Sequence, residues 1–166
     1  VAEDVGGTTI GRPYLSGGFH RANGVTAFTQ GRQHRPSDVA ILKNKRLEVV
    51  TALNDDLLDY RALGKVTEVT YQSSFDGQEI QGWYVTPPDF DPTKKYPLIL
   101  EIHGGPHLAY GPHFSAELQL MAAAGYVVFY NNYRGSLSYG EDFAPLLQYK
   151  YSSVRAFAAH FSGLLP

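Results

Sequence analysis

The residues best suited to chemistry form the run Leu100-Glu101-Ile102-His103-Gly104-Gly105-Pro106-His107. Its two glycines lack a Cβ atom, so the main chain there can take strained angles and approach a bound substrate closely. A backbone N–H aimed at the oxyanion of an acyl-transfer reaction contributes roughly 3 kcal/mol of transition-state stabilisation. The run therefore predicts an oxyanion-binding loop. The alternative is a glycine-rich turn in which the histidine is incidental.

The segments on either side predict the elements that hold this run. Tyr96 to Ile102 is short and nearly all apolar, as expected of a strand buried on both faces of a mostly parallel sheet. Ser115 can cap the start of a helix, and Gly125 stands where a C-terminal glycine belongs. Tyr126 to Tyr130 predicts a second buried strand, which completes a βαβ unit. The helix is expected to be amphipathic because apolar residues recur at helical spacing: Phe114, Leu118 and Met121.

A glycine-rich loop between such a strand and helix is typical of α/β-hydrolases, and His-Gly-Gly marks the lipase and esterase version. In that fold the nucleophile occupies Gly-x-Ser-x-Gly, followed along the chain by the acid and the histidine. No serine of this chain has glycine at both −2 and +2, since Ser138 is followed by Gly140 but preceded by Ser136. The chain is thus expected to carry the loop without a nucleophile, and we interpret Ser138 as a loop serine.

The remaining segments after residue 64 flank the βαβ unit. A hairpin is predicted over Val66 to Thr86, with its turn at Asp76-Gly77. Pro and Asp content makes Pro87 to Lys95 a surface loop, and Asn132 to Ser136 is expected to be a turn. Tyr139 to Tyr149 has the pattern of a helix, but Pro145 is tolerated only in a first helical turn.

The first 64 residues consist of short β-type runs separated by turn signals. Asn23-Gly24 predicts a type I′ hairpin. A further strand is expected over Asp38 to Leu42, after the turn-rich stretch from Gly31 to Ser37, and another over Leu47 to Leu53. Such short antiparallel hairpins are typical of one blade of a β-propeller.

Composition excludes several classes of function. The chain has a formal net charge of −2 over 166 residues, so it lacks the positive potential that nucleic-acid binding requires. No run approaches the roughly 20 apolar residues that span a bilayer, so we expect no membrane segment. The absence of cysteine excludes a thiol nucleophile and leaves the compartment open. Three histidines, His103, His107 and His113, lack metal-ligand spacing, so no metal or cofactor is expected.

Three segments together resemble the prolyl oligopeptidase family of serine peptidases, and most closely its acylaminoacyl-peptidase-like and dipeptidyl-peptidase-like members. They are Phe75 to Trp83, Tyr96 to His107, and Asn132 to Ser136 with Tyr139-Gly140. The resemblance implies an α/β-hydrolase domain beneath a β-propeller, with short peptides as substrates. It matches Gly105 to the oxyanion-hole position, with His103, Gly104 and Pro106 shaping the loop.

The same resemblance divides the chain into two parts. Residues 1–64 would be the C-terminal end of a β-propeller, and residues 65–166 an incomplete α/β-hydrolase domain whose apolar tail, residues 154–166, departs from the family. Because the Ser, Asp and His of the family find no match, we expect a piece of a peptidase that is inactive alone. Two alternatives stay open at this point: a carboxylesterase or lipase fragment, and a non-catalytic interaction module derived from a propeller.

Overall fold

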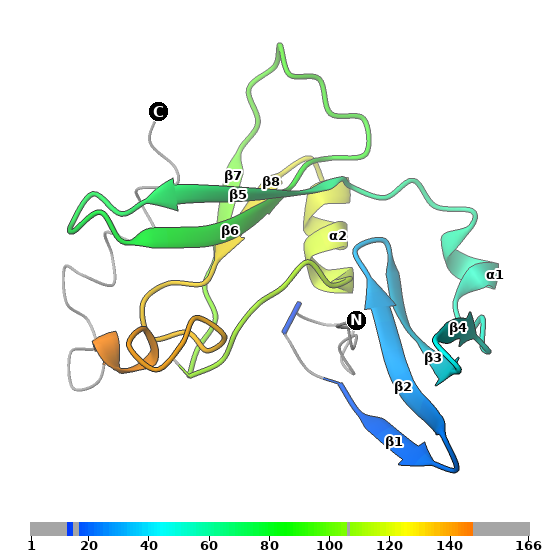
Figure 1. Cartoon of the computed structure of the whole chain (residues 1–166). Helices are drawn as coiled ribbons and strands as arrows, with labels where there is room; N and C mark the ends of the chain where they lie inside the picture. The colour runs from blue at the N-terminus through cyan, green and yellow to red at the C-terminus, as the bar shows by residue number, and fades with distance from the viewer. Residues whose placement is uncertain (1–12, 15–16, 106, 148–166) are drawn as a thin grey trace.

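The computed structural model describes residues 13–14, 17–105 and 107–147, which contain two separate four-stranded sheets (Figure 1). The expected features of Pro106 and of residues 154–166 lie outside the described residues. The first sheet is antiparallel, in the order β1-β2-β3-β4. Its strands are Phe19–Ala22, Val25–Arg32, Arg35–Lys43 and Arg46–Val49.

The predicted Asn23-Gly24 hairpin is confirmed. Both residues have positive φ, 50° and 76°, as a type I′ turn requires, and they join β1 to β2. The turn predicted over Gly31 to Ser37 is wrong at both ends, because β2 continues to Arg32 and β3 begins at Arg35. Gly31 lies at a register shift between Gln30 and Arg32, so β2 and β3 remain paired as far as Arg32 and Arg35.

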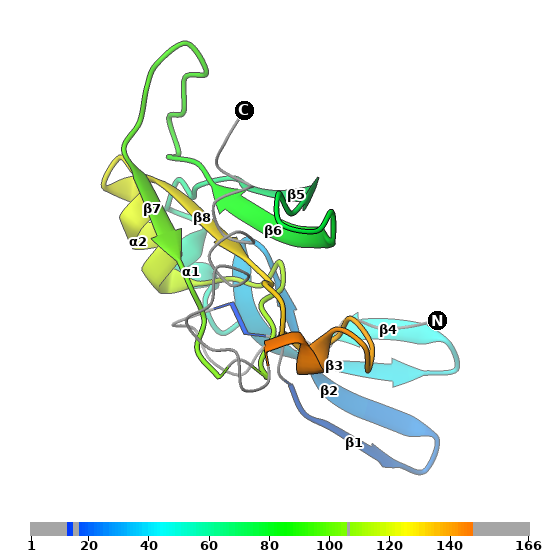
Figure 2. The same ribbon diagram turned by 90° about the vertical axis from the view of Figure 1, so that its left-hand side faces the viewer.

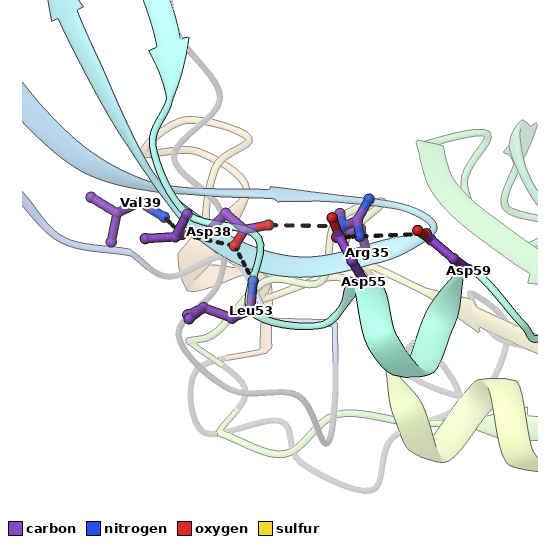
Figure 3. A network of polar contacts seen from close by, with 7 residues as sticks. Arg35, Asp38, Val39, Leu53, Asp55 and Asp59 are labelled. Atoms are coloured by element: carbon purple, nitrogen blue, oxygen red, sulfur yellow. Dashed lines mark hydrogen bonds and ion pairs between the residues drawn. The ribbon is translucent and has the colours of Figure 1, made fainter.

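A polar network ties the first sheet to the short helix α1, Asp55–Leu58 (Figure 3). The Arg35 guanidinium forms ion pairs with Asp55 and, at 3.7 Å, with Asp59. On the other side the Oδ1 atom of Asp38 accepts hydrogen bonds from the Thr51 hydroxyl (2.8 Å) and the Leu53 N–H (3.0 Å). The strand predicted over Leu47 to Leu53 accordingly ends at Val49, because Thr51 and Leu53 bind the Asp38 side chain instead of pairing in the sheet.

The second sheet is mixed, in the order β5-β6-β8-β7 (Figure 2). Its strands are Val66–Gln72, Glu79–Val85, Val127–Asn131 and Leu98–Glu101 in that order. The predicted β5–β6 hairpin is confirmed. A mostly parallel sheet is wrong for the described residues, in which only β7 and β8 run parallel and β8 pairs antiparallel with β6.

Strand β7 was expected to be buried on both faces, which is wrong. It is the last strand in the order of the described sheet; Leu98 at its start is 47% exposed, and Ile102, just after its end, is 46% exposed. The Glu101 side chain beside them is buried, because the Tyr110 hydroxyl donates a hydrogen bond to its Oε1 atom (3.0 Å).

Helix α2, Ala116–Ala123, connects β7 to β8 and confirms both predicted helix ends. The Ser115 hydroxyl accepts from the Leu118 N–H (3.2 Å), and Gly125 has φ +93° directly after the C-cap. On the predicted apolar face, Phe114 and Leu118 are buried and Met121 packs against the core. The rest of the helix departs from an amphipathic pattern, because Gln119 is buried and Leu120 is 72% exposed. The Gln119 amide bonds the backbone of Gly64, accepting from its N–H (2.7 Å) and donating to its carbonyl (3.1 Å).

The main core lies between α2 and the second sheet. It consists of Trp83, Val85, Tyr110, Leu118, Ala122, Val128 and Tyr130. The helix predicted over Tyr139 to Tyr149 is wrong in its described part, where only a 3₁₀ turn forms at Ala144–Leu147 (η1). Gly140 has φ +90°, and Pro145 lacks the N–H that a longer helix would require.

Candidate active site

The predicted oxyanion loop begins where β7 ends. Because β7 and β8 are parallel, with Glu101 opposite Tyr130, the loops that follow them leave the same edge of the sheet. The first loop carries His103, Gly104 and Gly105, and the second carries Asn132 to Ser136. Three of the four predicted site residues therefore stand together, and the fourth, Pro106, lies outside the described residues.

His103 is buried between the two loops, with 2% of its surface exposed. Its Nε2 atom lies 2.9 Å from Ser136 Oγ, and its Nδ1 atom lies 3.0 Å from the Gly104 carbonyl oxygen. The ring stacks on Tyr133 (4.6 Å between centroids) and meets Tyr110 edge-on (4.9 Å). Burial lowers the pKa of His103 below its ordinary value, against the opposing effect of the Gly104 carbonyl, so the ring is neutral at pH 7.

The two loops are also joined through Asn132. Its side chain accepts from the Tyr110 N–H (2.7 Å) and donates to the Tyr110 carbonyl (2.8 Å) and to the Tyr139 hydroxyl oxygen (2.7 Å). The Tyr133 hydroxyl donates to the His103 carbonyl (2.7 Å), and the Leu137 N–H donates to the Leu108 carbonyl (2.9 Å). The loop after β8 is thus the support of the loop after β7.

The glycines of the loop are exposed, in contrast to His103. Gly105 has φ +121°, a conformation that L side chains rarely adopt, and a Cβ atom there would lie 3.1 Å from the His107 nitrogen. Among the described residues, no group accepts a hydrogen bond from the Gly105 N–H. Within the described residues, the loop thus presents a backbone donor without an acceptor at the surface, which is the kind of group that binds an oxyanion.

The Asn132 to Ser136 motif predicted a turn, but it did not predict the contacts that this segment makes with His103. The turn is present, with the Ser136 N–H donating to the Tyr133 carbonyl (3.0 Å). Nothing in the motif indicates that Ser136 contacts His103, which lies 33 positions earlier in the sequence. The parallel pairing of the two strands, as predicted by the βαβ unit, was the signal that could have placed them together.

A cavity of about 290 Å³ lies away from this loop, against the first sheet. Its lining includes Arg35, which pairs with Asp55 and Asp59. In the part of the chain that the structure describes, no three His, Cys, Asp or Glu side chains gather as metal ligands. The helices described are also too short to cross a bilayer.

Comparison with known proteins finds similarity to peptidases. A model of the prolyl oligopeptidase family matches residues 112–157. The chain is 36% identical over 118 residues to the uncharacterized peptidase YuxL of Bacillus subtilis, covering 70% of this chain and 18% of that protein. It is 39% identical over 101 residues to dipeptidyl-peptidase 5 of Porphyromonas gingivalis, covering 60% of this chain and 15% of that protein.

The solved acylaminoacyl peptidase of Pyrococcus horikoshii is similar in fold. It superimposes on 89% of this chain with a TM-score of 0.79 and 28% sequence identity, and the match covers 23% of that structure. The chain thus spans under a fifth of these curated relatives and about a quarter of this structure. Family model, relatives and fold agree in what the chain is similar to: residues 112–157 match the prolyl oligopeptidase family, whose members are serine peptidases, and the relatives and the solved structure are peptidases.

Proposed function

We propose that this chain carries the oxyanion-binding part of a serine peptidase that cleaves short peptides through an acyl-enzyme. In such a reaction, attack on the scissile carbonyl places negative charge on its oxygen, and the Gly105 N–H donates a hydrogen bond to that oxygen. Gly104 leaves room for the substrate, since nothing lies within 4 Å of a Cβ atom built there. His103 and Pro106 belong to the same loop.

One observation carries the proposal: in the loop after β7, an exposed glycine of positive φ has an N–H that finds no acceptor among the described residues. A simple strand-to-helix turn has no need of a buried histidine and tyrosine beneath it. The surrounding polar network holds the loop in one conformation before substrate arrives, which is what makes a donor effective in catalysis.

The proposal includes a division of the chain. Residues 1–64 would be the end of a β-propeller and residues 65–166 part of an α/β-hydrolase domain. The separation into an antiparallel four-stranded sheet and a mixed sheet with a βαβ unit supports this division. The names of the relatives, a dipeptidyl-peptidase and an acylaminoacyl peptidase, support peptides as the substrate class.

A chimeric enzyme tests the proposal. Residues 98–137 of this chain replace the matching segment of the Pyrococcus horikoshii acylaminoacyl peptidase, and the kcat for an acylaminoacyl anilide is measured. We expect activity in the chimera and about a hundredfold lower kcat in its Gly105→Ala variant, because the strained φ turns the N–H away.

Leu120→Ala on α2 is the control, since this side chain is 72% exposed and lies outside the loop. It should stay within about threefold of the chimera in kcat, as an uncrowded surface substitution does. Equal activity of the chimera and its Gly105→Ala variant would contradict the assignment of the oxyanion donor.

A further inference from the structure

His103 binds the loop through both ring nitrogens, and the chemistry of the partners assigns each one a role. A carbonyl oxygen can only accept, so the 3.0 Å contact to Gly104 requires a proton on Nδ1. In the neutral ring, Nε2 then accepts from the Ser136 hydroxyl at 2.9 Å. The structure thus contains one defined tautomer of a buried histidine.

The Gly104 carbonyl and the Gly105 N–H belong to the same peptide group. Because that group is planar and trans, its C=O and N–H bonds point in opposite directions. Holding the carbonyl inward against the imidazole therefore turns the N–H outward, to the side where Gly105 is exposed and finds no acceptor among the described residues.

We propose that His103 is a positioning residue whose Nδ1–H, by holding the Gly104 carbonyl, aims the Gly105 N–H at the substrate. This inference rests on the proposed function for its purpose, although the geometry stands without it. A peptide group between two glycines rotates easily, because neither residue has a Cβ atom to restrict it. The loop needs such a hold for its donor to stay in one orientation.

The surroundings keep the imidazole in the required place. Tyr133 stacks on one face of the ring, and its hydroxyl donates to the His103 carbonyl at 2.7 Å. Tyr110 meets the ring edge-on and is itself held by Asn132. Rotation of the ring would break the contacts to Gly104 and Ser136 together.

Nuclear magnetic resonance of the 166-residue chain tests the tautomer directly. The ¹⁵N shifts of the His103 ring distinguish a protonated from an unprotonated nitrogen, and we expect protonated Nδ1 and unprotonated Nε2 at pH 7. A ring protonated on Nε2 alone would overturn the proposal, since Nδ1 could not then hold the carbonyl. This measurement requires neither a variant nor catalytic activity.

Two variants separate positioning from folding. Asn places an amide N–H near the position of Nδ1, whereas Gln reaches the position of Nε2, so His103→Asn retains the hold on Gly104 and His103→Gln retains the contact to Ser136. The residual dipolar coupling of the Gly105 N–H reports its orientation. We expect the wild-type value in His103→Asn and a reduced value in His103→Gln, with the flipped peptide populated about fivefold more.

The same two variants in the active chimera complete the test. The kcat of His103→Asn should exceed that of His103→Gln by about fivefold, with KM unchanged. Wild-type orientation of the Gly105 N–H in His103→Gln would overturn the positioning role. An oriented N–H whose loss leaves kcat unchanged would instead contradict the proposed function and leave the geometry intact.

Discussion

Arg134 and Asp76 form a bidentate ion pair that joins the loop after β8 to the tip of the β5–β6 hairpin. Arg134 Nε donates to Asp76 Oδ2 at 3.2 Å, and an Nη atom of Arg134 contacts Asp76 Oδ1. The Arg134 side chain is 2% exposed and the Asp76 side chain 41% exposed. The Phe75 ring lies 5.9 Å from the guanidinium carbon. A buried cation is thus neutralised by a partner that solvent reaches.

Replacing Asp76 by Asn should lower the free energy of unfolding by about 1–3 kcal/mol. Removing one partner of a fully buried pair costs about 3–5 kcal/mol, and the partial exposure of Asp76 reduces this because water already screens its carboxylate. Urea unfolding measures the change. Asp89→Asn on the exposed loop between β6 and β7 is the control, expected within about 0.5 kcal/mol of wild type. Equal losses in both variants would contradict a specific role for the pair.

Gly64→Ala should destabilise the chain by about 1–3 kcal/mol through overpacking. A Cβ atom there would collide with the Thr86 carbonyl oxygen and lie 2.9 Å from Val85 Cγ1, and the backbone cannot yield easily because Gln119 bonds both its polar groups. Thermal unfolding measures the loss. Gly18→Ala, whose Cβ would meet nothing within 4 Å, should leave the midpoint nearly unchanged. A similar midpoint for both variants would show that the tight packing at Gly64 is relieved at no cost.

Local signals predicted much of the secondary structure because the interactions behind them are local. The Asn23-Gly24 hairpin depends only on the φ angles of these two residues. Ser115 caps α2 by accepting a hydrogen bond from the Leu118 N–H, three residues later. The exposure of β7 could not be predicted, since it depends on which strand ends the sheet. The same holds for Gln119, whose burial is explained by Gly64, 55 residues earlier.

In the candidate site, too, local features could be predicted and long-range contacts could not. The glycine run predicted an oxyanion-binding loop, and this stays a prediction; the structure adds that the Gly105 N–H finds no acceptor among the described residues. The partners of His103 are long-range: Ser136 and Tyr133 come from the next loop along the sheet edge. A single sequence shows which residues are suited to chemistry, whereas their support depends on strand pairing.

Stability should fall on acidification because of His103. Its folded-state pKa is lowered, mainly by burial, so the unfolded chain takes up a proton at higher pH than the folded chain does. The stabilising contribution is complete above the ordinary histidine value of 6.5 and is lost as pH falls through it toward the folded pKa. Urea unfolding of wild type between about pH 7 and pH 5 should therefore show a steeper loss than in His103→Asn. His107→Asn on the exposed loop should keep the wild-type slope; parallel curves for wild type and His103→Asn would contradict the assignment.

The pairing of Ser136 with His103 resembles a nucleophile and its base, but its burial makes a different prediction. Ser136 has no exposed surface, its hydroxyl is committed to Nε2, and no serine of the chain stands in Gly-x-Ser-x-Gly. A fluorophosphonate probe should therefore leave the 166-residue chain unlabelled when read by mass spectrometry, with an active serine peptidase labelled in parallel as the control. Unfolding in urea exposes Ser136 but also removes its contact with His103, so the unfolded chain should stay unlabelled as well. Labelling of Ser136 in the native chain would show instead that this pair is a reactive centre.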